Sequence, residues 1–216
     1  MSNSKSWVAP LTGVVFAGLM ILGFVLTDGA GDASNATQKT AQEIVDHYKD
    51  NKDQQMLGSF VLGLAAVFFL FFAGWIRKVL RDAEGAGGTL SAVSLAGAIV
   101  FVAGAGVVAT IGFALADLAG DIDPIALQAI NAISYDFFIP FAIGMSTFLL
   151  ATGISVVRHG ALPKWLGWVA IVIGVASYSP AGFFVFPLSL VWVVVVSILL
   201  TARARGGGAR AAGAPA

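Results

Sequence analysis

Residues 56–76 read MLGSFVLGLAAVFFLFFAGWI, and no charged side chain interrupts this stretch. A transmembrane α-helix needs about 20 consecutive apolar residues to cover about 30 Å of hydrocarbon. The stretch ends at Arg77 and Lys78, and such charges belong at the boundary between membrane and water. Residues 56–76 are therefore predicted to cross a membrane as an α-helix.

The composition of the whole chain supports this class of protein. Of its 216 residues, 58% are hydrophobic and 11% are charged, whereas soluble domains average about 45–50% and about 25%. The formal net charge is zero, so no attraction to nucleic acid is expected. The chain has no cysteine, which excludes disulfides, thiolate nucleophiles and Cys-ligated metals.

Five further apolar stretches flank the first one. The six predicted spans cover about residues 7–27, 56–76, 90–116, 135–157, 165–182 and 184–202. Residues 7–27 exceed the apolar core of a signal peptide, about 7–15 residues, and no small-x-small site follows at once. We therefore expect the first span to be retained rather than cleaved.

The last two spans come from one unbroken apolar run, residues 165–202. As a single helix this run would be about 57 Å long, which is too long for one crossing. Ser179-Pro180-Ala181-Gly182 and then Pro187 interrupt it, and proline removes a helical hydrogen-bond donor. Two crossings are predicted. The alternative is one long tilted helix that would place the C-terminus on the other side.

Basic and acidic residues alternate between the two sides of this six-span arrangement. One side holds nine of the twelve basic residues: Lys5, Arg77, Lys78, Arg81, Arg158, Lys164, Arg203, Arg205 and Arg210. The other side holds ten acids: Asp28, Asp32, Glu43, Asp46, Asp50, Asp53, Asp117, Asp121, Asp123 and Asp136. Loops rich in Lys and Arg stay in the cytoplasm. We predict an all-α, six-helix bundle in a bacterial plasma membrane, with both termini cytoplasmic.

Three segments outside the spans have their own character. Residues 36–54 are predicted to form an extracytoplasmic amphipathic helix, because Ala41, Ile44, Val45 and Tyr48 share one helical face. Residues 124–133 are a second, shorter amphipathic piece, preceded by an Asp-Pro helix start. The Gly/Ala-rich tail, residues 206–216, is expected to be disordered.

The central parts of the six spans contain no Lys, Arg, Asp, Glu or His. Ionisable residues inside the membrane mark pumps, proton relays and voltage sensors, so these classes are excluded. No histidine pair is available to ligate a membrane haem, and no mid-span lysine to bind retinal. No cofactor is therefore predicted.

The clustered ionisable residues of the outer face are the candidates for chemistry. Glu43, Asp46, His47 and Asp50 fall on one helical stripe, which fits either a divalent-cation site or a solvated helix face. Asp136, with Glu43 or Asp46, is a candidate catalytic carboxylate. It equally fits an interfacial acid stabilised by a helix N-terminus. The simpler interpretation is favoured in both cases, so neither a metal site nor a catalytic site is predicted.

The cytoplasmic loops and the small residues of the spans suggest binding rather than chemistry. Five basic residues are candidates for contacts with anionic lipid headgroups: Arg77, Lys78, Arg158, Lys164 and Arg203. Small residues that let helices approach closely recur in the spans: Gly13, Ala17, Ser59, Gly63, Gly97, Gly104, Gly106 and Gly112. They fit an intramolecular core or a contact between two copies of the chain.

Several short segments carry a resemblance to known proteins: LPKWLGW (162–168), FPL (186–188), VWV (191–193) and SILL (197–200). They resemble a group of small actinobacterial membrane proteins of unknown function, similar to a DUF4386-like family. Members often carry a segment like EIVDHY (43–48) before the second span. The resemblance implies a multi-pass membrane protein and an actinobacterial source. It assigns no activity, cofactor or catalytic residue.

Three functions remain open from the sequence. The favoured one is a non-enzymatic membrane protein, an accessory or scaffold subunit that binds membrane lipid, other membrane proteins or a second copy of itself. The first alternative is a carrier or channel for small molecules or lipid, for which Ser, Thr and Gly would have to supply the path. The second is a membrane-embedded enzyme that uses the outer carboxylates.

Overall fold

The computed structural model describes residues 9–28, 40–134, 138–179 and 182–212, and every regular element in these ranges is a helix. The elements are η1 (Ala9–Leu11), α1 (Thr12–Asp28), α2 (Ala41–Asp50), α3 (Lys52–Glu84), α4 (Thr89–Leu118), α5 (Pro124–Ser134), α6 (Phe138–His159), α7 (Lys164–Ser177) and α8 (Gly182–Ala212).

Within the described ranges, four helical stretches are long and apolar enough to cross a membrane: α3, α4, the stretch Pro124–His159, and Phe184–Ala204 of α8. Two shorter apolar helices are Thr12–Thr27 and Lys164–Ser177. At about 1.5 Å per residue, α7 is about 21 Å long, which is less than the thickness of a hydrocarbon core. The protein is thus all-helical with four helices of membrane-spanning length, while six crossings stay a prediction.

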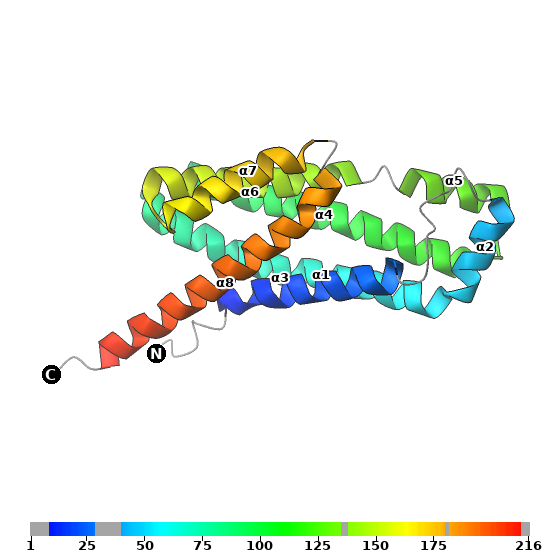
Figure 1. The fold of residues 1–216 in the computed structure, drawn as a ribbon, viewed down its shortest axis with the longest axis horizontal. Helices are drawn as coiled ribbons and strands as arrows, with labels where there is room; N and C mark the ends of the chain where they lie inside the picture. The colour runs from blue at the N-terminus through cyan, green and yellow to red at the C-terminus, as the bar shows by residue number, and fades with distance from the viewer. Residues whose placement is uncertain (1–8, 29–39, 135–137, 180–181, 213–216) are drawn as a thin grey trace.

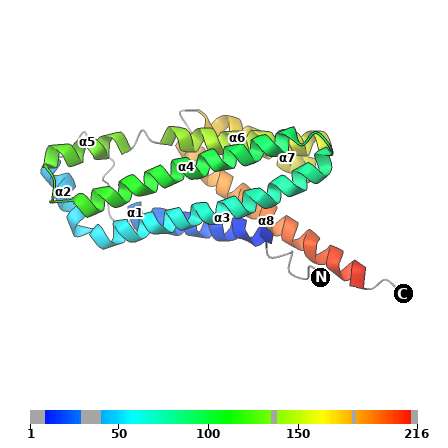
Figure 2. The ribbon, with the colours of Figure 1, turned by 180° about the vertical axis from the view of Figure 1, so that it is seen from behind.

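The helices are arranged as an elongated bundle with one oblique member (Figure 1). Helices α1, α3, α4 and α6 run along the long axis, and α7 lies against α6. Helix α8 crosses them at an angle and projects beyond the bundle (Figures 1 and 2). The start of α1, the end of α8 and the turns α3–α4 and α6–α7 lie at one end, which we call the basic end. Helices α2 and α5 lie at the opposite, acidic end.

The centre of the bundle is filled by phenylalanine rings. The Phe69 ring centroid lies 4.7 Å from that of Phe16, 4.8 Å from that of Phe101 and 5.1 Å from that of Phe148. These rings come from α3, α1, α4 and α6, and all four are fully buried. Tilted and edge-to-face ring contacts add to the stabilisation from buried area. One aromatic core therefore joins four helices.

Glycines bring α4 and α6 into close contact. A Cβ atom added at Gly97 would lie 2.5 Å from the Phe148 amide nitrogen, and one at Gly104 would lie 2.7 Å from the Phe141 amide nitrogen. Gly63 and Gly106 face open space instead. Gly97 and Gly104 therefore serve the packing of α4 against α6 within this chain, whereas Gly63 and Gly106 do not take part in such a contact.

Three boundaries differ from those expected. The outer amphipathic helix, expected over residues 36–54, is α2, which begins after the N-cap Thr40 and ends at Asp50; Asn51 then separates it from α3. The break predicted in the apolar run 165–202 is present, but α7 ends at Ser177 rather than near residue 182, and α8 begins at Gly182.

The third difference concerns the tail. Helix α8 continues to Ala212, so residues 206–212 of the expected disordered tail are helical. Extending an existing helix costs far less than starting one, so α8 continues through three glycines, which are poor helix formers, into a segment rich in Ala and Arg.

Candidate functional site

A hollow lies between α7 and α8, and we call it the α7–α8 groove. Its walls include Trp165, Trp168 and Val172 from α7, and Leu188, Val191 and Val195 from α8. Its volume is about 480 Å³. This size falls in the range of pockets that bind small organic ligands, about 300–1,000 Å³.

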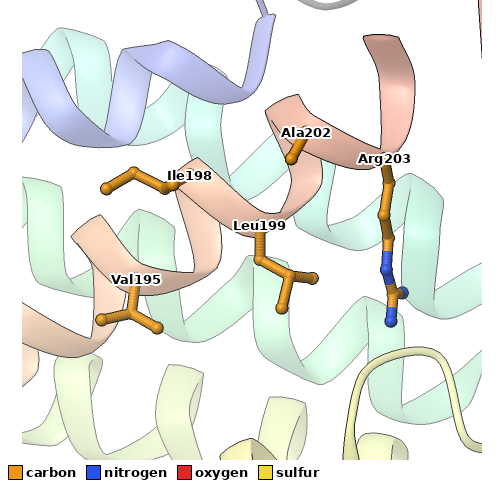
Figure 3. A pocket seen from close by; sticks show the side chains of 5 residues that line it. All are labelled: Val195, Ile198, Leu199, Ala202 and Arg203. Carbon is orange, nitrogen blue, oxygen red and sulfur yellow. The ribbon is translucent and has the colours of Figure 1, made fainter. Parts of the chain in front are cut away.

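A second hollow continues the groove along α8 toward the basic end. Val195, Ile198, Leu199, Ala202 and Arg203 line it, and its volume is about 640 Å³ (Figure 3). Val195 lines both hollows, so the two are contiguous. The combined groove is apolar throughout except at Arg203.

The groove exists because α7 and α8 are held by different neighbours. Gly153 of α6 and Gly167 of α7 allow close packing, since a Cβ atom at Gly153 would lie 2.6 Å from the Gly167 carbonyl oxygen. Helix α8 packs against α1 at Gly13, where an added Cβ atom would collide with the Ser197 hydroxyl. Helix α7 therefore stays on α6 while α8 crosses toward α1, and a wedge opens between them.

A tryptophan fixes the point at which the two helices meet. The Trp192 indole Nε1–H donates a hydrogen bond of 3.0 Å to the Leu166 carbonyl oxygen, and Trp192 is buried. In sequence terms Trp192 is the one tryptophan placed in the middle of a predicted span rather than at a boundary. An indole N–H in an apolar interior needs an acceptor, so the mid-span position of Trp192 is the sequence signal from which a contact of this kind could have been predicted.

The walls of the groove are open to the surroundings of the bundle. Val172 is 66% exposed, Val191 is 59% exposed and Trp168 is 58% exposed. In a bilayer these surfaces would face lipid, for which apolar side chains are suited. The groove is thus accessible from the plane of the membrane.

Arg203 closes the groove at the basic end. Its Nη1–H donates to the Ala161 carbonyl oxygen over 3.1 Å, and the side chain is exposed. Figure 3 shows Arg203 extending from α8 toward the chain that joins α6 to α7. Lys164, the first residue of α7, is exposed in the same connection. Two of the five headgroup candidates therefore stand near one end of an apolar groove.

The other three headgroup candidates lie on α3 and α6. The Lys78 ammonium sits 5.1 Å from the centroid of the Trp75 ring, a cation–π distance. Arg77 is half-buried, and its Nε has no hydrogen-bond acceptor among the described residues. Arg158 is exposed near the end of α6. None of these three lines either hollow described above.

The outer carboxylates serve the local structure of α2. Glu43 completes a capping box, since its Oε2 accepts 2.6 Å and 2.9 Å hydrogen bonds from the Thr40 amide and hydroxyl. Asp46 accepts a 2.8 Å hydrogen bond from the Gln42 side chain. Both of these roles are those of an ordinary exposed helix.

The four residues considered as a cation stripe, Glu43, Asp46, His47 and Asp50, are engaged separately or exposed. His47 stacks its ring edgewise on Tyr48, with centroids 5.4 Å apart, and Asp50 is exposed. Among the described residues, no three His, Cys, Asp or Glu side chains are grouped so that they could hold a metal ion. Asp136 lies outside the described residues.

Helix α2 is instead joined to α5, and the first residue of α3 is joined to the end of α4. The Tyr48 hydroxyl donates a 2.8 Å hydrogen bond to Oδ1 of the buried Asn131, and Lys52 pairs with Asp117 at 3.2 Å. The position of Asn131, one turn after Leu127 on the inner face of residues 124–133, is the sequence signal for this contact.

A polar contact at the basic end escaped sequence reasoning. Glu84 is half-buried; its Oε1 accepts a 2.5 Å hydrogen bond from the Ser155 hydroxyl and its Oε2 accepts one of 3.2 Å from the Ser91 amide. His159 Nδ1 lies 3.2 Å from the Ser155 carbonyl oxygen rather than from its hydroxyl. Ser155, His159 and Glu84 therefore do not form a catalytic triad, because the histidine does not contact the serine hydroxyl.

No protein-family model matches this chain, and neither a curated protein nor a solved structure matches it. The resemblance to a DUF4386-like family stays a prediction.

Proposed function

We propose that this protein is a non-enzymatic integral membrane protein, an accessory subunit of a bacterial plasma membrane, that binds a lipid acyl chain in the α7–α8 groove. The basic end faces the cytoplasm in this proposal. The observation that carries it is a contiguous apolar groove that is open to the side of the bundle and ends at a cation.

The dimensions of the groove suit one acyl chain. From Leu188 to Arg203 the groove follows α8 for about 22 Å, at about 1.5 Å per residue. One leaflet contributes about half of a hydrocarbon core of about 30 Å, which is shorter than the groove. Helix α8 runs obliquely to the bundle, so the groove spans less depth than its length along the helix (Figure 1). An apolar hollow offers water no hydrogen-bond partners, so a hydrocarbon chain fills it at lower cost than water does.

The interior of the bundle gives less support to a carrier or channel. The rings around Phe69 fill the centre, where a path would have to run. Hydroxyl groups that would line such a path are bonded within the bundle: Ser94 pairs with Thr152 at 2.8 Å, and Ser146 donates to the Gly174 carbonyl oxygen at 2.7 Å. These groups satisfy one another and leave less capacity for a solute.

An enzyme that uses the outer carboxylates is also less well supported. Glu43 is committed to its cap, and Asp46 to a neighbour on its own helix. Both are exposed to solvent, and a catalytic acid usually needs a less polar environment that shifts its affinity for protons.

Filling the groove tests the proposal. Val172→Trp places an indole in the groove and is expected to expel the acyl chain, since the space is apolar and already bounded by three tryptophans. The measurement is the amount of phospholipid retained per protein after purification in mild detergent, read by native mass spectrometry.

Val67→Trp is the matched control, because Val67 is 49% exposed on α3 and lines neither hollow. The proposal expects lipid to be retained by the wild type and by Val67→Trp, and lost from Val172→Trp. Equal retention by all three proteins would show that bound lipid does not occupy the groove.

A further inference from the structure

Arg203 marks one end of the groove as chemically different from the rest. The other lining positions of the second hollow are Val195, Ile198, Leu199 and Ala202, all apolar. Arg203 shares the hollow with them while its Nη1 is anchored on a carbonyl oxygen of the α6–α7 connection (Figure 3). The guanidinium is therefore held at the end of the groove by its hydrogen bond to Ala161.

The charge of Arg203 is not neutralised by its anchor. The Ala161 carbonyl is uncharged, and among the described residues no carboxylate lies within ion-pair distance of Arg203. A guanidinium carries five N–H donors, of which one is used in this contact. The remaining donors suit a planar, two-point contact with a phosphate group.

Other features reinforce the positive potential at this place. Lys164 is exposed only three residues beyond Ala161. Helix α7 begins at Lys164, and its N-cap Pro163 makes no side-chain hydrogen bond to the first turn. The start of a helix carries a partial positive charge and unpaired amide groups.

The aromatic rim gives the depth of the site. Trp165 and Trp168 are exposed, line the groove and lie in the first turns of α7. Tryptophan is enriched at the level of lipid headgroups. The cations and the tryptophans therefore mark a headgroup level at the basic end, with the apolar groove extending from it into the hydrocarbon.

We infer that the α7–α8 groove is selective for an anionic glycerophospholipid of the leaflet at the basic end, whose phosphate contacts Arg203 and whose acyl chain lies along α8. This inference rests on the proposed function and adds headgroup selectivity to it. The ligand source is a membrane lipid, because a free phosphate ion would leave the apolar length of the groove unused.

The test compares two lipids and two arginine variants. The purified full chain is titrated in detergent with phosphatidylglycerol, which is anionic, and with phosphatidylcholine, which is zwitterionic, and native mass spectrometry reports occupancy. Arg203→Gln removes the charge but keeps a long polar side chain. Arg158→Gln is the matched control, an exposed arginine at the basic end that lines neither hollow.

The wild type is expected to bind phosphatidylglycerol severalfold more tightly than phosphatidylcholine, because both lipids carry the phosphate that Arg203 would contact but the choline ammonium is repelled by Arg203 and Lys164. Arg203→Gln should lose this preference and still bind phosphatidylcholine. Arg158→Gln should keep the preference. If Arg203→Gln keeps it as well, the inference is overturned while the proposed function stands, whereas failure of the wild type to bind either lipid overturns both.

Two further measurements guard the interpretation. Ala202→Glu introduces an acid beside Arg203 in the same hollow and should weaken binding of phosphatidylglycerol more than binding of phosphatidylcholine, whether or not Arg203→Gln folds well. Inorganic phosphate at the concentration of the lipid should not compete. Competition by phosphate alone would show an ion site rather than a lipid site and would contradict the inference.

Discussion

At the scale of single residues, polar side chains inside the bundle tie neighbouring helices together. Trp192 joins α8 to α7, Ser146 joins α6 to α7, and Glu84 joins the end of α3 to α6. A buried polar group is costly unless it is bonded, so each of these contacts favours one arrangement of the helices. Glu84 also accepts from the Ser91 amide in the first turn of α4, where a negative charge is stabilised by the helix dipole.

We expect Glu84→Ala to lower the free energy of unfolding by about 1–3 kcal/mol, since the Ser155 hydroxyl and the Ser91 amide would lose a charged acceptor. Asp82→Ala is the control, because Asp82 is exposed and should change stability by less than about 0.5 kcal/mol. Denaturation in mixed detergent, followed by circular dichroism, gives both values. Similar values for the two variants would mean that Glu84 does not link the helices.

At the scale of helices, the close approach of α4 and α6 depends on the absence of side chains at Gly97 and Gly104. In a membrane, helix association relies on packing because lipid is as apolar as the helices. The same two helices also contribute Phe101 and Phe148 to the aromatic core. The glycine contact and the ring cluster therefore support each other along one interface.

Gly97→Leu should separate α4 from α6 and destabilise the fold by about 1–3 kcal/mol, because the new side chain would meet the backbone of Phe148. Gly106→Leu, in the same helix, should be tolerated, since nothing lies within 4 Å of a Cβ atom there. Unfolding in detergent compares the two variants. Greater damage from Gly106→Leu would indicate that this face packs against another molecule.

Periodicity and composition predicted the helices but not their mutual angles. The membrane-spanning length of residues 56–76 and the break near Pro180 could be read from the chain, because local residue types decide them. The oblique course of α8 could not, since it depends on Gly13 meeting Ser197, residues far apart in sequence. Glu43 was considered for chemistry on spacing alone, whereas the capping box that uses it lies within four residues.

At the scale of the whole molecule, the two ends differ in charge. The turns α3–α4 and α6–α7 and the end of α8 bring basic residues toward one end: Arg77, Lys78, Arg158, Lys164 and Arg203 (Figure 1). Helix α2 and the connection between α4 and α5 place acids at the other end. Successive helices of the bundle run in opposite directions (Figure 1). Basic residues therefore gather at one end only if they occur in every second connection along the chain. The α7–α8 groove ends at Arg203, at the basic end.

The most direct test of the account is the side of the membrane on which each end lies. The chain has no cysteine, so single cysteines report without interference. In intact cells, a membrane-impermeant maleimide should label Asp53→Cys and Asp121→Cys, and should label Asp82→Cys, Lys164→Cys and Arg205→Cys only after the membrane is opened. Labelling of Lys164→Cys and Arg205→Cys from opposite sides would contradict the hairpin of α7 and α8, and with it the groove on which the proposed function depends.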